Sequence, residues 1–240
     1  MINEKVEEIR SKLKELANQE LAANYKRYLK SPFEFYGLRV PELRKIAKEY
    51  KNLELSEIYC LFNELWNSGN HEEKLMAIFL LASKEKQFDY ETWKFSLAKI
   101  KDIKTWDHCD GISSWVLGKM LAKDISLKKD IENFSESKNP WERRAAIIST
   151  SQLIKERKLE LTFKLAEKLV YDEDVYVQKG AGWMLREAGK RERLAVRDFI
   201  LRHLDMKAYA FSYATEKMKE LRKIKKQKER PEKNVNKKQN

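Results

Sequence analysis

The segment YVQKGAGWMLR at residues 176–186 decides the class of fold, because three earlier segments match it in register. They are HEEKLMAIFLL at 71–81, WDHCDGISSWV at 106–116 and WERRAAIISTS at 141–151, so each segment starts 35 residues after the one before. The sixth residue of the four segments is small or flexible: Met76, Gly111, Ala146 and Ala181. An internal repeat of this length is typical of helical-repeat proteins.

Apolar residues recur at spacings of three and four along the body of the chain, which indicates helices. Pro41, Ser56 and the pair Asn139 and Pro140 mark helix starts, and no stretch predicts a strand. We therefore predict an all-α fold: an α-solenoid of HEAT-like hairpins, each burying its apolar face against its neighbours. The tryptophan, glycine and proline signature of tetratricopeptide repeats is missing. A curved stack of hairpins presents a concave face that suits an extended polymer.

The composition excludes several other classes of protein. Of 240 residues, 42% are apolar, which excludes a wholly disordered chain, and seven glycines and four prolines are too few for a β-sandwich or barrel. Two cysteines and three histidines give neither a disulfide framework nor zinc-ligand spacing. The longest apolar run, Leu75 to Ala82, is too short to span a bilayer, and the charged N-terminus is unlike a signal peptide. We expect a soluble, cytoplasmic protein without a metal or cofactor.

The positive charge is concentrated at the end of the chain. The formal net charge is +12, and residues 217–240 hold eleven lysines and arginines against three glutamates. Because these residues include few apolar side chains, we expect a repeat domain over 1–218 and a basic, disordered tail over 219–240. Such a tail fits a solubilising end as well as a tether to a polyanion.

One position of the repeat carries a side chain that the fold does not require. The fifth residue of the four segments is Leu75, Asp110, Ala145 or Gly180, so a single carboxylate stands where the others are apolar or small. A charge at a semi-buried position costs several kcal/mol unless it is paired. Asp110 is therefore a candidate functional residue. The alternative is a carboxylate near a helix start that backbone amides or a lysine satisfy.

The tryptophans fall into two groups. Trp106 lies one helical turn before Asp110, so its ring shares a face with that carboxylate. Helical spacing favours a core position for Trp66, Trp93 and Trp115.

Trp183 has charged neighbours, which is unusual for a core residue. It is spaced at helical intervals from Lys179, Arg186 and Lys190, which places an aromatic ring among cations on one face. One interpretation is a binding surface. The other is a buried ring whose neighbours extend their charged ends to water.

Cations also recur at equivalent points of successive segments. Arg143 and Arg144 follow Trp141, and Lys179 matches Arg144 one repeat later, so a stripe of cations could follow a phosphate backbone. The alternative is that these are ordinary solvated helix charges.

Three residues next to Trp106 could suggest a metal site or a nucleophile. They are Asp107, His108 and Cys109. Since only one other candidate ligand lies at a comparable repeat position, we do not favour either reading.

Four stretches, in this order and spacing, make the sequence recognisable. They are YLKSPFEFYGLRVPELRKIAK near the start, TWDHCD at 105–110, NPWERRAAI at 139–147 and VQKGAGWMLREAGK at 177–190. The chain resembles the DNA alkylation repair family of HEAT-repeat glycosylases, the AlkD-like proteins. The resemblance covers residues 1–218 and leaves the tail unmatched.

The resemblance implies roles for individual residues. The W-D-x-x-D motif assigns catalytic roles to Trp106 and Asp110, and the G-W-x-L-R-E motif assigns one to Trp183. Arg144 matches an arginine that contacts the DNA backbone beside the lesion. Tyr28 and Arg186 are expected to face DNA. Together with the cations of the stripe, the predicted DNA-binding residues are Arg144, Arg186, Tyr28, Lys179 and Arg143. Cys109 stands where the family more often has an aliphatic residue.

The implied activity is hydrolysis of the N-glycosidic bond of positively charged alkylated purines, such as 3-methyladenine and 7-methylguanine, in duplex DNA. The family is known for acting without flipping the base out of the helix. We expect a monofunctional, monomeric enzyme in base excision repair.

Two other functions remain open on the sequence. A non-catalytic HEAT-repeat scaffold could grip damaged or branched DNA, or a protein, through the same basic face. An RNA-binding solenoid would require a preference for single strands or 2′-hydroxyls, and no feature of the sequence points to one.

Overall fold

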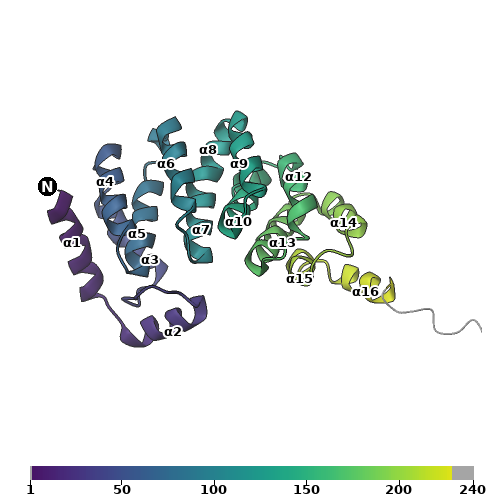
Figure 1. Ribbon diagram of the computed structural model, residues 1–240, viewed down its shortest axis with the longest axis horizontal. Helices are drawn as coiled ribbons and strands as arrows, with labels where there is room; N and C mark the ends of the chain where they lie inside the picture. The colour runs from purple at the N-terminus through teal and green to yellow at the C-terminus, as the bar shows by residue number, and fades with distance from the viewer. Residues whose placement is uncertain (1, 229–240) are drawn as a thin grey trace, which may run out of the picture. The chain divides into compact units, whose positions relative to one another are not determined.

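The computed structural model describes residues 2–228, and helices joined by loops make up this part of the chain (Figure 1). The only β-type pairing among them is an isolated bridge between Glu34 and Asn70. The chain divides into two compact units, Met1–Lys129 and Asp130–Asn240. The predicted all-α class is confirmed.

Unit 1 is built around α5, which packs against α3, α4 and α7. Its helices are α1 (Ile2–Glu15), α2 (Gln19–Leu29), α3 (Val40–Glu49), α4 (Leu55–Trp66), α5 (His71–Ala82), α6 (Tyr90–Ile100), α7 (Trp106–Ile112), a π-helical segment (Ser113–Leu117) and α8 (Gly118–Lys123), with short 3-10 helices at Glu85–Gln87 and Ile125–Leu127. Helix α9 (Lys128–Ser135) contains the boundary between the units.

Unit 2 is built around α13, which packs against α10, α12, α14 and α15. Its remaining helices follow α9 in chain order: α10 (Pro140–Ile148), α11 (Ser151–Lys155), α12 (Glu160–Leu169), α13 (Val175–Gly189), α14 (Arg193–Arg202), α15 (Ala208–Ala214) and α16 (Lys219–Lys228).

The four repeated segments all begin helices, namely α5, α7, α10 and α13. The residue before three of these helices caps the first turn with its side chain: Asn70 accepts from two backbone amides, Asn139 from one and Asp174 from two. Such caps satisfy amides that have no partner within the helix. The register of the repeat is thus a register of helix starts.

Side-chain hydrogen bonds between residues about one repeat length apart recur in both units. In unit 1, His71 bonds Asp107 and Lys99 bonds Asn63, in both cases across 36 residues. In unit 2, Arg157 bonds Glu192 across 35 residues. Stacked equivalent hairpins would produce this pattern. It supports the predicted HEAT-like solenoid, which stays a prediction.

Two of the three predicted core tryptophans are buried. Trp66 is 3% exposed and Trp93 is fully buried, as expected. The prediction for Trp115 is wrong, because this ring is half-buried. It stacks on Phe79, and the Arg44 guanidinium lies 4.7 Å from its centroid. A cation over the ring face explains how Trp115 can stay partly at the surface.

The predicted disordered tail begins with ordered structure. Residues 219–228 form α16, and Leu221 is fully buried, so the expectation of disorder is wrong for this part. Leu221 anchors the helix although the surrounding sequence is basic. The rest of the predicted tail, 229–240, lies outside the described residues. No helix in the described part of the chain is long and apolar enough to cross a membrane.

Candidate functional site

Helix α7 carries the two predicted catalytic residues of unit 1. Trp106 opens the helix and Asp110 follows one turn later, and both side chains are half-buried. Tyr28 from α2 is 73% exposed and meets the Trp106 ring edge-on, with centroids 6.3 Å apart. Unit 1 therefore brings Tyr28 to the helix face that holds Trp106 and Asp110.

The helix that carries Asp110 continues directly into a π-helical segment. The amide of Gly118 donates to the carbonyl of Ser113 instead of to a residue four positions back. At Gly111, an added Cβ would lie 3.2 Å from Ile78 and 3.3 Å from Trp115, so α7 and α5 are in close contact there. π-Helical turns of this kind are frequent at functional sites. No pattern in the amino-acid sequence predicts this π-helical turn.

A buried network fixes the start of α7 on the start of α5. The Nε2 of His71 donates to Asp107 Oδ2 at 2.8 Å, and the Nε2 of His108 donates to the carbonyl of His71 at 3.1 Å. Thr105 Oγ1 lies 2.8 Å from the other nitrogen of His108. His71 also stacks on Phe35, with centroids 4.4 Å apart. Trp106 is thus in a firmly held first turn, and Asp110 follows it on the same helix.

The surroundings of this network favour a neutral His108 and an ionised Asp107. Burial lowers the pKa of His108 to about 3, although the charge of Asp107 acts in the opposite direction. Burial acts to raise the pKa of Asp107, but the hydrogen bond from His71 and the neighbouring imidazoles outweigh it and lower the pKa to about 2. Near neutral pH His108 is neutral, so its Nδ1 accepts from Thr105, while Asp107 is ionised.

Three residues of this network have side chains that can bind a metal ion. Ligand atoms of His71, Asp107 and His108 lie within 4.8 Å of one another. A zinc ion must lie in the plane of each imidazole, about 2.0 to 2.1 Å from nitrogen. The two rings are tilted by only 31°, with centroids 4.2 Å apart, so their lone pairs do not converge. Both nitrogens of His108 already have protein partners. The geometry is that of a hydrogen-bond network.

A second buried carboxylate holds the loop between α2 and α3. Glu72 is 1% exposed and accepts hydrogen bonds from the backbone amides of Tyr36, Gly37 and Leu38. Three amides on one carboxylate fix the loop that follows the helix of Tyr28. Glu72 was not among the predicted functional residues, although its place in the first turn of α5 was a signal that the sequence carried.

In unit 2, Trp183 lies beside a carboxylate as well as cations. Its indole N–H donates to Glu187 Oε1 at 3.2 Å, and Lys190 Nζ contacts both oxygens of Glu187 at 2.7 Å. Arg186 pairs with Glu216. The predicted cationic surroundings of Trp183 are therefore largely neutralised. Glu187 was missed, although it lies one helical turn after Trp183.

The two arginines of α10 make internal contacts. Arg143 forms a two-pronged ion pair with Asp172, at 2.6 and 3.0 Å, and also bonds two backbone carbonyls. Arg144 is 5% exposed and donates to the carbonyl of Tyr176. Gly180 leaves room for it, since an added Cβ would lie 3.2 Å from the guanidinium. The alternative of ordinary solvated charges is wrong for Arg144.

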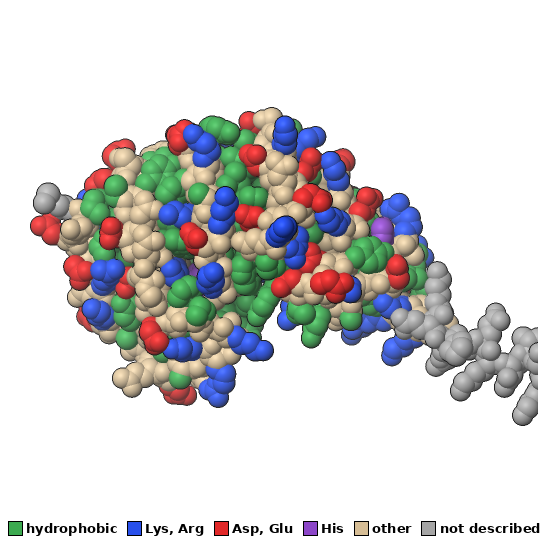
Figure 2. Space-filling view, viewed as in Figure 1, with side chains coloured by type: hydrophobic (Ala, Val, Ile, Leu, Met, Phe, Trp, Pro, Cys, Tyr) green, Lys and Arg blue, Asp and Glu red, His purple; other side chains and the backbone are tan. Residues whose placement is uncertain are grey.

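Lys179 is the third cation of the predicted stripe, and it lies among aromatic rings. Its ammonium is 5.0 Å from the centroid of Tyr209 and 5.7 Å from that of Tyr176. Tyr176 in turn packs on Trp141, with centroids 5.3 Å apart. On the face seen in Figure 2, lysines and arginines are interspersed with acidic side chains within each unit.

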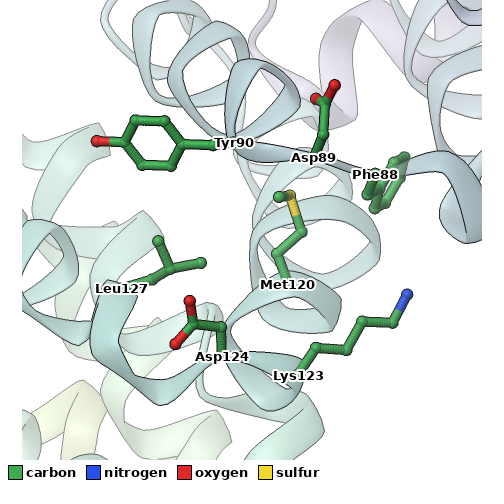
Figure 3. A pocket seen from close by; sticks show the side chains of 7 residues that line it. All are labelled: Phe88, Asp89, Tyr90, Met120, Lys123, Asp124 and Leu127. Carbon is green, nitrogen blue, oxygen red and sulfur yellow. The ribbon is translucent and has the colours of Figure 1, made fainter.

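One pocket of unit 1 lies apart from these residues. It is lined by side chains from α6, α8 and the adjoining loops: Phe88, Asp89, Tyr90, Met120, Lys123, Asp124 and Leu127. The carboxylates of Asp89 and Asp124 do not point toward one another (Figure 3). Each instead accepts hydrogen bonds at the start of a helix, and none of the predicted site residues lines the pocket.

Comparison with known proteins identifies the chain's relatives. The model of a family described as "DNA alkylation repair enzyme" matches residues 9–218. A solved structure of a predicted DNA alkylation repair enzyme from Enterococcus faecalis is 22% identical, with a TM-score of 0.75 over 84% of this chain and 96% of that one. AlkD2 from Streptococcus mutans is 21% identical, with a TM-score of 0.58 over 82% and 97%. No match is found among curated proteins.

Proposed function

Because the chain belongs to the DNA alkylation repair enzyme family, we propose that it hydrolyses the N-glycosidic bond of positively charged alkylated purines in duplex DNA. The observation that carries the proposal is Asp110, a half-buried carboxylate one turn after Trp106, at a repeat position that is otherwise apolar or small. A carboxylate and a tryptophan ring on one face of a helix are groups that stabilise a developing positive charge.

The proposed chemistry follows from the charge of the substrate. An alkylated purine such as 7-methylguanine is a cation, so its glycosidic bond is already weakened. As the bond breaks, positive charge develops on the deoxyribose, in a state related to that of glycoside hydrolysis. Ionised Asp110 would stabilise this charge or orient the attacking water. The ring face of Trp106 in unit 1 and that of Trp183 in unit 2 are each suited to attract a cationic sugar.

The other residues have supporting roles in the proposal. Arg144 would act on the DNA backbone beside the lesion, and its bond to the Tyr176 carbonyl would hold it in a set position. Tyr28, Arg186 and Lys179 would add contacts to DNA. Arg143 forms an ion pair with Asp172. We therefore propose that Arg143 supports α10 instead of binding DNA as predicted. No base flipping is required, because the lesion is read through its charge.

Release of 7-methylguanine from a modified duplex tests the proposal. Replacing Asp110 by Asn keeps the size of the side chain and removes its charge, so base release should fall about 100-fold or more, while affinity for the duplex changes little. Asp102→Asn is the matched control, because Asp102 is exposed in the loop before α7. Equal release by wild type and Asp110→Asn would refute the role of Asp110. No release by either, with tight duplex binding by both, would instead indicate a non-catalytic DNA scaffold.

A further inference from the structure

The side chain of Trp183 has one polar atom, and that atom is engaged. The indole N–H donates to Glu187 Oε1 at 3.2 Å from one turn further along α13, and both side chains are half-buried. A tryptophan held only by packing at a partly exposed site can rotate about its side-chain torsions. A hydrogen bond at the edge of the ring restricts that rotation and sets the direction of the ring face.

The acceptor is itself held in place. Lys190 Nζ lies 2.7 Å from each oxygen of Glu187, and Arg186 Nε lies 3.5 Å from Oε1. Arg186 is held at its far end by Glu216. Glu187 is thus the centre of a small polar cluster, and two of the three cations predicted to surround Trp183, Arg186 and Lys190, lie against this carboxylate.

The backbone under Trp183 is also fixed. Gly182 lets α15 approach closely, because an added Cβ would lie 2.4 Å from the carbonyl of Ala210 and 2.7 Å from Tyr213 Cβ. With the helix position set by this contact, the freedom left to Trp183 is in its side-chain torsions. The hydrogen bond to Glu187 restricts rotation about these torsions.

We propose that Glu187 is a positioning residue: it holds the Trp183 ring in the orientation needed to face the cationic sugar. This inference rests on the proposed glycosylase function. Glu187 acts through its acceptor oxygen and not through its charge, because the orientation of the ring depends on the hydrogen bond. Misplacing a catalytic group by about 1 Å can cost about 100-fold in rate.

The test compares Glu187→Ala, Glu187→Gln and the control Glu192→Ala in single-turnover release of 7-methylguanine. Glu187→Ala should slow release about 10- to 100-fold and leave duplex Kd within about threefold, since orientation matters in the transition state. Glu187→Gln keeps an acceptor oxygen and should recover most of the rate. The side chain of Glu192 is 42% exposed and pairs with Arg157, and this residue serves as the control. Unchanged release in Glu187→Ala, or no recovery in Glu187→Gln, would overturn the proposal.

A second readout separates positioning from activity. The emission of Trp183 is obtained as the difference between each protein and its Trp183→Phe counterpart. It should shift in Glu187→Ala and return in Glu187→Gln, at a temperature well below the thermal midpoint of both variants. An unchanged Trp183 emission in Glu187→Ala would overturn the proposal. If the wild type releases no base, the glycosylase function fails, and this measurement still decides whether Glu187 orients Trp183.

Discussion

At the scale of single residues, His108 makes the stability of the protein depend on pH. Burial lowers its pKa to about 3, against about 6.5 in an unfolded chain. The unfolded state therefore binds a proton that the folded state does not bind, and stability is lost as the pH falls below about 6.5. Between about pH 6 and 5, the free energy of unfolding should fall by about 1 kcal/mol per pH unit.

Urea denaturation at a series of pH values measures this slope. His108→Gln should be less stable than the wild type but should flatten the slope over the same range, because glutamine does not titrate. His203→Gln, in the other unit, is the matched control and should keep it. The same slope in all three proteins would show that His108 is not the group responsible. Asp107 adds a further loss below about pH 4, since the pKa of its carboxyl is lowered to about 2.

At the scale of elements, the contact between α13 and α15 depends on Gly182. A helical Gly→Ala change ordinarily stabilises a helix by about 1 kcal/mol. Here the new methyl would lie 2.4 Å from a backbone carbonyl, so the helices must separate. Overpacking of this kind costs about 1 to 3 kcal/mol, and we expect Gly182→Ala to be destabilising.

The measurement is again the free energy of unfolding in urea. Gly69→Ala is the matched control, because no atom lies within 4 Å of the Cβ it would add. It should leave stability nearly unchanged. Gly182→Ala as stable as the wild type would mean that α13 and α15 can separate at no cost.

At the scale of the whole molecule, the net charge of +12 overstates the number of cations available to DNA. Internal pairs such as Arg143 with Asp172, and Arg186 with Glu216, occupy cations that the sequence presented as a binding surface. A protein gains from counterion release only for cations that reach phosphates. The salt dependence of duplex binding should therefore be modest for so basic a chain.

Glu216→Gln tests this view of the charge distribution. It frees Arg186, so duplex affinity should rise, and the slope of log Kobs against log salt should become steeper by about 1. Glu173→Gln, which releases Lys207 in the same unit, is the control and should leave both unchanged. No change with Glu216→Gln would show that Arg186 does not contact phosphate.

The sequence by itself determined the helical class and the register of the helix starts. It also determined that Asp110 is the single carboxylate at a repeat position that is otherwise apolar or small. These depend on local periodicity, on capping residues such as Asn70 and on comparison between repeats. The tertiary structure decided that Trp115 is half-buried and that Arg144 is buried. It also decided that Glu187 pairs with Lys190 and Glu216 with Arg186 near Trp183. Burial and ion pairing depend on which helices pack together. Pairs such as Arg186 with Glu216, 30 residues apart, therefore form only once the helices have packed.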